Sequence, residues 1–318
     1  MICKILLISD IHLPVLTPQK SNPFKYKNTI ENNFHVNRLI LLADEINTLR
    51  PDRVYILGDL LDSTNINLCT CEVLKTFIQK IGSIVYYLNG NHERINQNEY
   101  ILDYLDIGMR PLPTTHTIHK TSITSLNHSQ LYDAPHITSD ILLSHFRWIL
   151  PAFWGTKGEL SKSDLGIVTS NYSDVILGDI HAEFEPEDNV TYVNQPYSNK
   201  YLPASPKGLI ELSIDEDGYD IIRHHLDLPN KILITCNFNE IDDVLNTLDK
   251  RHLYKIRINI KSAEVDSLPI PNNKVKFDLI ISGTDSEEVL AIERENVLDT
   301  LLSVIPEQDR EYIEGILK

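Results

Sequence analysis

Five short apolar runs, each followed closely by Asp, Asn or His, constrain the fold of this chain more than any other feature of its sequence. An apolar run with β-branched residues that ends in a polar turn is typical of a buried parallel strand. In open α/β sheets, ligands lie beyond the carboxyl ends of such strands. The sequence therefore predicts that these strands gather polar side chains into one site. The runs are Lys4–Ser9 before Asp10-Ile11-His12, Val54–Leu57 before Gly58-Asp59, Ile84–Leu88 before Gly90-Asn91-His92-Glu93, Ile141–Leu143 before Ser144-His145, and Val175–Leu177 before Gly178-Asp179-Ile180-His181.

The residues that follow these runs supply carboxylate, amide and imidazole groups, and no thiolate. This set suits a hard or borderline divalent ion such as Mn²⁺, Mg²⁺ or Fe²⁺ better than a structural Zn²⁺. Seven ligands are too many for one ion and about right for two. Asp59 has two carboxylate oxygens and follows the central strand, so it is the natural bridge between two ions. The seven candidate ligands are Asp10, His12, Asp59, Asn91, His145, Asp179 and His181.

The same blocks, in the same order, resemble the metallophosphoesterase superfamily, also called calcineurin-like phosphoesterases. The family pattern is Asp-x-His, Gly-Asp-x-x-Asp, Gly-Asn-His-Asp/Glu, a lone His and Gly-His-x-His, and the resemblance spans residues 1 to about 213. One position departs from it, because Asp179 stands where the family usually has His. The resemblance implies that His92 is a general acid or transition-state stabiliser near the leaving oxygen and not a ligand. It assigns Asp10, His12, Asp59 and His181 to one ion, and Asp59, Asn91, His145 and Asp179 to the other.

Within the superfamily, the chain most resembles SbcD-type DNA repair and recombination nuclease subunits of phage or bacteria. Its length, a small module after the phosphoesterase part and a helical C-terminus carry this resemblance, and Asp62 is compatible with the bacterial motif. The resemblance implies a Mn²⁺-dependent exonuclease and endonuclease acting on the ends of double-stranded DNA. It also implies a homodimer bound to an SbcC-type coiled-coil ATPase. The alternatives are a phosphomonoesterase or a small-molecule or cyclic-nucleotide phosphodiesterase acting alone, and a scaffold that binds without cleaving.

The pattern of apolar residues divides the chain into three parts. Residues 1–228 are expected to form an α/β catalytic domain, a two-sheet βα sandwich with helices at 32–49, 71–81 and 98–105 and a second, more antiparallel half. Residues 229–284 are expected to form a small α+β capping module with strands at 231–236, 254–260 and 276–281 and a helix at 241–248. Residues 285–318 read as two helices broken at Pro306, a candidate docking element for a partner.

Charge and cysteine content bear on partners and compartment. A formal net charge of −16 argues against strong, free-standing DNA binding, since neutralising phosphates needs Lys and Arg. We therefore expect a partner to supply basic surface. The four cysteines are expected to be reduced thiols of a cytoplasmic protein, in the host cytoplasm if the chain is phage-encoded. We expect no membrane span. The sequence assigns no substrate-binding residue, although the loops at 13–31 and 147–162 are either plain surface or substrate-facing.

Overall fold

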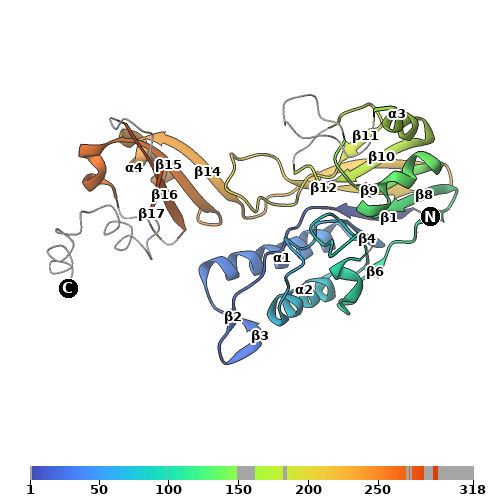
Figure 1. Ribbon diagram of the computed structural model, residues 1–318, viewed down its shortest axis with the longest axis horizontal. Coiled ribbons are helices and arrows are strands. Elements are labelled where there is room, and N and C mark those ends of the chain that lie inside the picture. Colours follow the sequence, from blue (N-terminus) through green and yellow to red (C-terminus); the bar gives the residue numbers. More distant parts are fainter. Residues whose placement is uncertain are drawn as a thin grey trace. The chain divides into compact units, whose positions relative to one another are not determined.

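The computed structural model describes residues 2–97, 99–148, 162–181, 185–269, 272, 274–282 and 289–292. The chain divides into two compact units (Figure 1). Unit 1 comprises Met1–Tyr197 and Ser205–Leu228, and unit 2 comprises Ser198–Ala204 and Pro229–Lys318. All seven candidate ligands belong to unit 1.

Two sheets form the framework of unit 1. The strands of the first are β1 (Cys3–Ile8), β4 (Arg53–Leu57), β5 (Ile84–Leu88), β6 (Arg110–Pro111), β12 (Gly208–Ile214) and β13 (Tyr219–His225). Their order is β13-β12-β1-β4-β5-β6, with β1, β4, β5 and β6 parallel and the β12–β13 hairpin antiparallel. Residues predicted to form strands before the first three motifs therefore do lie side by side as parallel strands.

The second sheet contains β7 (Thr115–Ile118), β8 (Thr121–Leu126), β9 (Ser139–His145), β10 (Tyr172–Gly178) and β11 (Val190–Tyr192). Their order is β11-β10-β9-β8-β7, and only the β7–β8 pair is antiparallel. The prediction of a more antiparallel second half is therefore wrong. Helical crossovers, and not tight hairpins, join β8 to β9 and β9 to β10, and such crossovers bring a strand back parallel to the one before it.

Helices cover the outer faces of both sheets. They are α1 (Ile30–Leu49), α2 (Leu68–Lys80), α3 (Lys162–Asn171) and the 3₁₀ helices η1 (Ile101–Tyr104) and η2 (His128–His136). Both α1 and α2 begin before the residues predicted from apolar spacing, because a polar cap starts each one. Thr29 Oγ1 accepts from the Asn32 N–H at 3.2 Å, and Asn67 Oδ1 accepts from the Thr70 N–H at 3.0 Å. The helix expected at residues 98–105 is only the short 3₁₀ turn η1.

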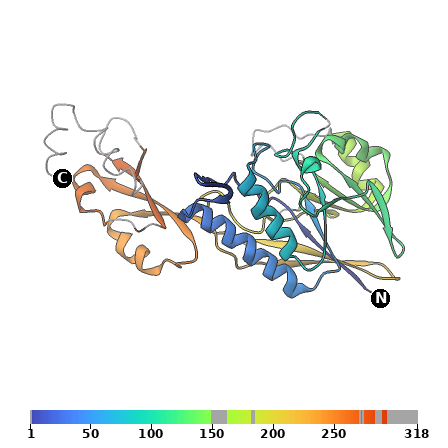
Figure 2. The same cartoon turned by 90° about the horizontal axis from the view of Figure 1, so that it is seen from below.

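The core of unit 1 has three apolar layers, and the two faces of β1 show why. Leu6 and Ile8 pack under α1 and α2, whereas Ile5 and Leu7 pack between the two sheets. A third apolar cluster lies between the second sheet and α3. Figures 1 and 2 show the resulting order of layers: helices, sheet, sheet and helix. Unit 1 is thus an α/β two-sheet sandwich, as predicted, and the rigid sheets fix where each strand ends.

Unit 2 contains a mixed sheet with strands β14 (Lys231–Asn237), β15 (Leu253–Lys261), β16 (Val275–Ser282) and β17 (Val289–Ile292), together with α4 (Ile241–Thr247) and the 3₁₀ helices η4 (Phe238–Glu240) and η5 (Ser262–Ser267). The first three strands are parallel, and β17 is antiparallel to β16. Alternate residues of β15 are buried, as the period-2 pattern predicts. The apolar spacing predicts helix at Val289–Ile292, but these residues pair with the free edge of β16, whose backbone groups offer hydrogen bonds. The remainder of the predicted C-terminal helices lies outside the described residues.

A small hairpin made of β2 (Pro18–Gln19) and β3 (Asn22–Tyr26) interrupts the loop predicted at residues 13–31. Within the described part of the chain, no helix is both long and apolar enough to cross a membrane.

Candidate metal centre

The candidate ligands lie at or just beyond the carboxyl ends of five strands, and four of the seven have a positive φ. Asp10, His12, Asp59 and Asp179 have φ angles of 57°, 47°, 51° and 93°. Residues other than glycine rarely adopt such angles, and strain of this kind is concentrated at functional sites. Backbone bonds hold the first two motifs together, since the His12 N–H donates to Asp59 O at 2.8 Å and the Asp10 N–H donates to Gly58 O at 3.2 Å.

The first cluster consists of Asp10, His12 and His181, whose ligand atoms all lie within 4.8 Å of one another. His12 Nε2 lies 2.9 Å from His181 Nε2, and His181 Nε2 lies 3.3 Å from Asp10 Oδ1. Asp10 is fully buried, yet its Oδ1 accepts no hydrogen bond from the described residues. A buried oxygen without a donor, facing two imidazole nitrogens, fits a divalent cation at the point where all three converge.

The second cluster consists of Asp10, Asp59 and His145. Asp59 Oδ2 lies 3.3 Å from His145 Nε2 and 3.6 Å from His12 Nε2, so one oxygen faces both clusters. His145 Nδ1 donates to Leu57 O at 2.8 Å, which leaves Nε2 as the ligand atom. This is the arrangement that a bridging carboxylate between two ions requires.

Asn91 lies beside the second cluster. Its Oδ1 is 3.1 Å from His145 Nε2 and faces only hydrogen-bond acceptors. Either rotation of the amide or a cation between these groups satisfies them, so Asn91 also fits a metal ligand set.

His92 belongs to neither of these clusters; it forms a third, more exposed metal-like group with His12 and Asp62. Its Nδ1 donates to Asp62 O at 2.8 Å, and its backbone N–H donates to Asp59 Oδ1 at 3.1 Å. Its Nε2 is 3.9 Å from Asp59 Oδ2, and 39% of the side chain is exposed. Because a carbonyl oxygen only accepts, Nδ1 carries a proton and Nε2 is the nitrogen that can exchange one with a substrate.

The ionisable groups of the two clusters shift one another's pKa. Burial opposes ionisation of Asp10, yet its close contacts with the imidazoles of His12 and His181 hold the pKa of its carboxyl well below the usual range. Burial likewise opposes protonation of His12, but its contacts with Asp10 and Asp62 raise its pKa to about 10. The pKa of His145 is raised by Asp59 despite complete burial. The buried carboxylates are therefore stabilised in their ionised form by positive charge beside them. A bound cation would supply such positive charge.

Glu93 supports the site, although sequence reasoning assigned it no role. This buried carboxylate accepts backbone N–H bonds from Asp59 and Gly90 at 3.0 Å each and from Leu61 at 2.8 Å. Burial and the nearby Asp59 raise the pKa of Glu93 to about 7. It ties the loop after β4 to the loop after β5, and the signal for it was its place as the acid of the Gly-Asn-His-Glu block.

Asp179 is the candidate whose side chain does not join the others. Its Oδ2 accepts from Arg147 Nε at 3.0 Å and its Oδ1 from Arg147 Nη2 at 3.4 Å. It belongs to none of the three metal-like groups found among the described His, Cys, Asp and Glu residues. The structure therefore places the Asp179 carboxylate against a guanidinium and outside these groups, and its ligand role stays a prediction. Its backbone does reach the site, since the Asp179 N–H donates to Asp10 Oδ2 at 3.2 Å.

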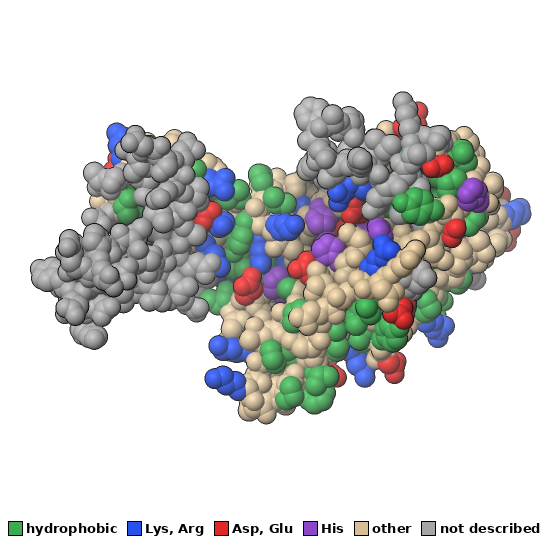
Figure 3. All heavy atoms as spheres, viewed as in Figure 1, with side chains coloured by type: hydrophobic (Ala, Val, Ile, Leu, Met, Phe, Trp, Pro, Cys, Tyr) green, Lys and Arg blue, Asp and Glu red, His purple; other side chains and the backbone are tan. Residues whose placement is uncertain are grey.

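The family model for calcineurin-like phosphoesterases matches residues 3–283. The chain belongs to this family. Calcineurin-like phosphoesterases are dinuclear metal enzymes, so the chain is a metal-dependent phosphoesterase, and its Asp and His clusters provide the kind of ligands that such a centre uses. Figure 3 shows histidine, acidic and basic side chains close together on the surface of unit 1.

Two solved structures are similar to this calcineurin-like phosphoesterase. One is the protein TT1561 of Thermus thermophilus, with 10% identity and a TM-score of 0.39, covering 70% of this chain and 99% of that one. The other is the purple acid phosphatase PPD1 from yellow lupin (Lupinus luteus) seeds, with 12% identity and a TM-score of 0.38, covering 71% of this chain and 54% of that one. Among curated proteins, none matches the chain.

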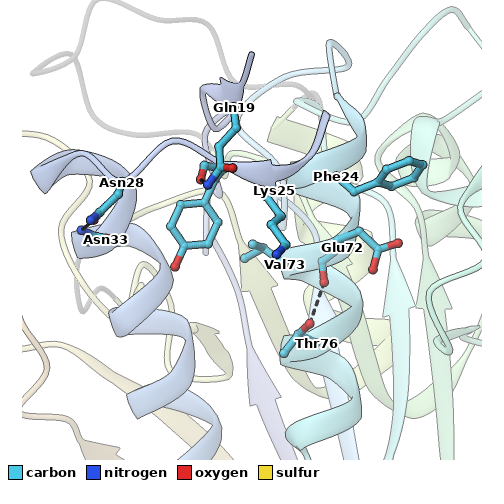
Figure 4. A pocket seen from close by; sticks show the side chains of 9 residues that line it. Gln19, Phe24, Lys25, Asn28, Asn33, Glu72, Val73 and Thr76 are labelled. Atoms are coloured by element: carbon cyan, nitrogen blue, oxygen red, sulfur yellow. Dashed lines mark hydrogen bonds between the residues drawn. The ribbon is translucent and has the colours of Figure 1, made fainter. Parts of the chain in front are cut away.

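A pocket of about 400 Å³ lies between the β2–β3 hairpin and helices α1 and α2 (Figure 4). Lys25 and Tyr26, from the loop predicted as either plain surface or substrate-facing, line this pocket together with Glu72 and Thr76 of α2. None of the seven candidate ligands is among its lining residues. These two side chains thus line a pocket that the candidate ligands do not share.

Proposed function

We propose that this phosphoesterase is a two-metal phosphodiesterase that acts as an exonuclease and endonuclease on the ends of double-stranded DNA. The observation that carries the two-metal part is the position of Asp59, whose Oδ2 faces both clusters. The length of the chain and the α+β unit that follows the catalytic unit support the comparison with SbcD-type nuclease subunits.

We propose Mn²⁺ as the ion, with Mg²⁺ and Fe²⁺ as alternatives, because oxygen and imidazole donors suit hard or borderline divalent ions and the resemblance to SbcD-type nucleases implies Mn²⁺. Asp10, His12, Asp59 and His181 would hold the first ion, and Asp59, Asn91 and His145 the second. Two divalent ions held by these residues would supply Lewis acidity to the phosphoryl oxygens and would lower the pKa of a water nucleophile.

His92 acts as the general acid in this proposal. Asp62 O holds its Nδ1, which fixes the ring and presents Nε2 at the partly exposed edge of the centre. A proton given by Nε2 to the leaving oxygen neutralises the charge that develops as the phosphoester bond breaks. The bond from the His92 backbone N–H to Asp59 Oδ1 holds this proton donor beside the second cluster.

The chain's net charge of −16 gives it little electrostatic affinity for DNA by itself. We therefore propose that an SbcC-type coiled-coil ATPase holds the DNA and that the nuclease acts as a homodimer within that complex. The corresponding compartment is the cytoplasm, or the host cytoplasm for a phage-encoded chain.

The decisive test compares substrates on one Mn²⁺-loaded preparation, with and without a co-expressed ATPase partner. Linear and supercoiled duplex DNA should be degraded, and the partner with ATP should stimulate digestion of linear DNA. Bis(p-nitrophenyl) phosphate should be cleaved faster than p-nitrophenyl phosphate. Rapid hydrolysis of the monoester or of a cyclic nucleotide, with intact DNA in both arms, would replace this proposal with that of a small-molecule phosphoesterase acting alone.

The partner proposal has its own test in the C-terminal tail. The variant ends at Ile292, which keeps β17 and removes residues 293–318 with the apolar positions Val297, Leu301 and Val304. Cleavage of bis(p-nitrophenyl) phosphate should persist, while co-purification of the ATPase and ATP-stimulated digestion should be lost. Normal co-purification of the truncated chain would place the docking surface elsewhere.

A further inference from the structure

Arg147 and Asp179 are brought together by neighbouring parallel strands. His145 of β9 pairs with Gly178 of β10, so Arg147 and Asp179 follow the same end of the sheet. Nε and Nη2 of the guanidinium each donate to a different oxygen of the Asp179 carboxylate, at 3.0 Å and 3.4 Å. This two-point contact fixes the plane of the guanidinium as well as its position.

The burial of the two partners is unequal. The side chain of Asp179 is 9% exposed and that of Arg147 is 37% exposed. A largely buried carboxylate needs a charged or hydrogen-bonding partner, and Asp179 has one in Arg147. These two bonds turn the Asp179 carboxylate toward Arg147. The more exposed partner is the cation, so the pair presents positive charge to solvent at the rim of the centre.

The Arg147–Asp179 pair lies next to the clusters, where the positive charge of Arg147 can act on a substrate. Asp179 also donates its backbone N–H to Asp10 Oδ2 at 3.2 Å, so the anchor of Arg147 is itself attached to a metal-cluster residue. Asp10, Asp59 and Asp62 would offset much of the charge of two divalent ions, so a further cation beside them would strengthen the attraction of an anionic substrate. A guanidinium has forked donors that match two phosphoryl oxygens.

We propose that Arg147, held in place by Asp179, binds the phosphoryl oxygens of the substrate. The position at which this chain departs from the family pattern thus exchanges a metal-binding imidazole for the anchor of a phosphate-binding arginine. The proposal concerns phosphate esters as a class. It rests on membership of the phosphoesterase family and does not depend on the nuclease proposal.

The first arm of the test measures Mn²⁺ binding by isothermal titration calorimetry. Asp179→Ala should bind Mn²⁺ with the stoichiometry of the wild type and with an affinity within a few-fold of it. Asp59→Asn, the matched control inside the clusters, should lose bound metal. Loss of one ion in Asp179→Ala would show that Asp179 is a ligand and would overturn the proposal.

The second arm measures binding of inorganic phosphate to the Mn²⁺-loaded protein. Arg147→Ala should weaken phosphate binding by about 10-fold or more, since a hydrogen bond to a charged group contributes about 1.5–3 kcal/mol. Arg147→Lys keeps the charge but loses the forked donors, so its phosphate affinity should lie between those of the wild type and Arg147→Ala. Arg223→Ala is the control, because Arg223 also pairs with a carboxylate, that of Glu185 at 2.9 Å. Phosphate binding by Arg147→Ala equal to that of the wild type contradicts the proposal.

The third arm asks whether Asp179 acts through Arg147. Asp179→Ala should weaken phosphate binding less than Arg147→Ala, and the double variant should match Arg147→Ala alone. Additive losses in the double variant would mean that the two residues act independently and would overturn the anchoring role. The melting temperature of each variant shows whether it folds. If Arg147→Ala does not fold, Arg147→Gln replaces it, with the same expected loss.

Discussion

The two clusters of the metal centre differ in how completely their predicted ligands meet. In the first cluster, every predicted residue turns its ligand atom inward, and two imidazole nitrogens approach within 2.9 Å. Around the second cluster, Asp59, His145 and Asn91 converge, but Asp179 is turned to Arg147. Both sets occupy equivalent places at strand ends. A strand end therefore decides which residues come near the centre, and the neighbouring side chains decide which of them face it.

The largest effect is expected from Asp59, whose Oδ2 faces residues of both clusters. Asp59→Asn should reduce phosphodiester cleavage by about 10⁴-fold or more, because it weakens both ion sites and the hold on His92. Calorimetry should show loss of Mn²⁺ from both sites, while far-ultraviolet circular dichroism should show an unchanged fold. The role of Asp59 as a ligand of both ions would be contradicted if anomalous scattering from a Mn²⁺-soaked wild-type crystal revealed one ion held without Asp59.

His92 should separate turnover from metal binding. His92→Ala should lower kcat by about 100-fold or more through loss of proton transfer to the leaving oxygen. Mn²⁺ stoichiometry and affinity should remain those of the wild type, because His92 lies outside both clusters. The effect should shrink for a substrate whose leaving group needs no proton, such as a p-nitrophenolate ester. Nearly full kcat on DNA or on an alkyl phosphodiester would remove His92 from the mechanism.

Substitution of Glu93 should lower the Mn²⁺ affinity of the two sites to different extents. Glu93→Gln leaves fewer acceptors for three backbone N–H groups, so it should weaken the loops that carry Asp59 and Asn91, with a loss of about 1–3 kcal/mol in the free energy of unfolding. Mn²⁺ affinity at the second site should fall by about 10–100-fold, and that at the first site by less. Glu211→Gln is the control, since Glu211 is also buried but bonds Lys4 and His224. Equal losses at both sites would mean that Glu93 supports the whole centre.

The smallest effect is expected from making the second cluster more like the first. Asp179→His places an imidazole where the family usually has one, and histidine tolerates positive φ better than most residues. Affinity for the second ion should rise by about a few-fold, and the order of activating metals should move toward softer ions. Phosphate affinity should fall because Arg147 loses its anchor. If Asp179→His left both the order of activating metals and the phosphate affinity unchanged, residue 179 would not account for a difference between the two clusters.

The apolar runs before Asp10, Asp59, Asn91, His145 and Asp179 were enough to predict the strands, because a buried parallel strand reads as a continuous apolar segment. The period-2 alternation of apolar residues likewise predicted strand β15. Polar caps at Thr29 and Asn67 shifted the helix starts, since a side-chain bond to the backbone carries more weight there than apolar spacing. Val289–Ile292 became a strand because an open sheet edge was available, which local sequence does not reveal.

The sequence by itself determined which side chains are delivered to the centre, because that depends only on where each strand ends. The tertiary structure decided where those side chains point and what holds them. Glu93 binds three backbone N–H groups from two different loops, and Arg147 captures Asp179 across two neighbouring strands. Contacts of this kind join residues that are distant in sequence, and their geometry follows from strand order and register, which no single motif encodes.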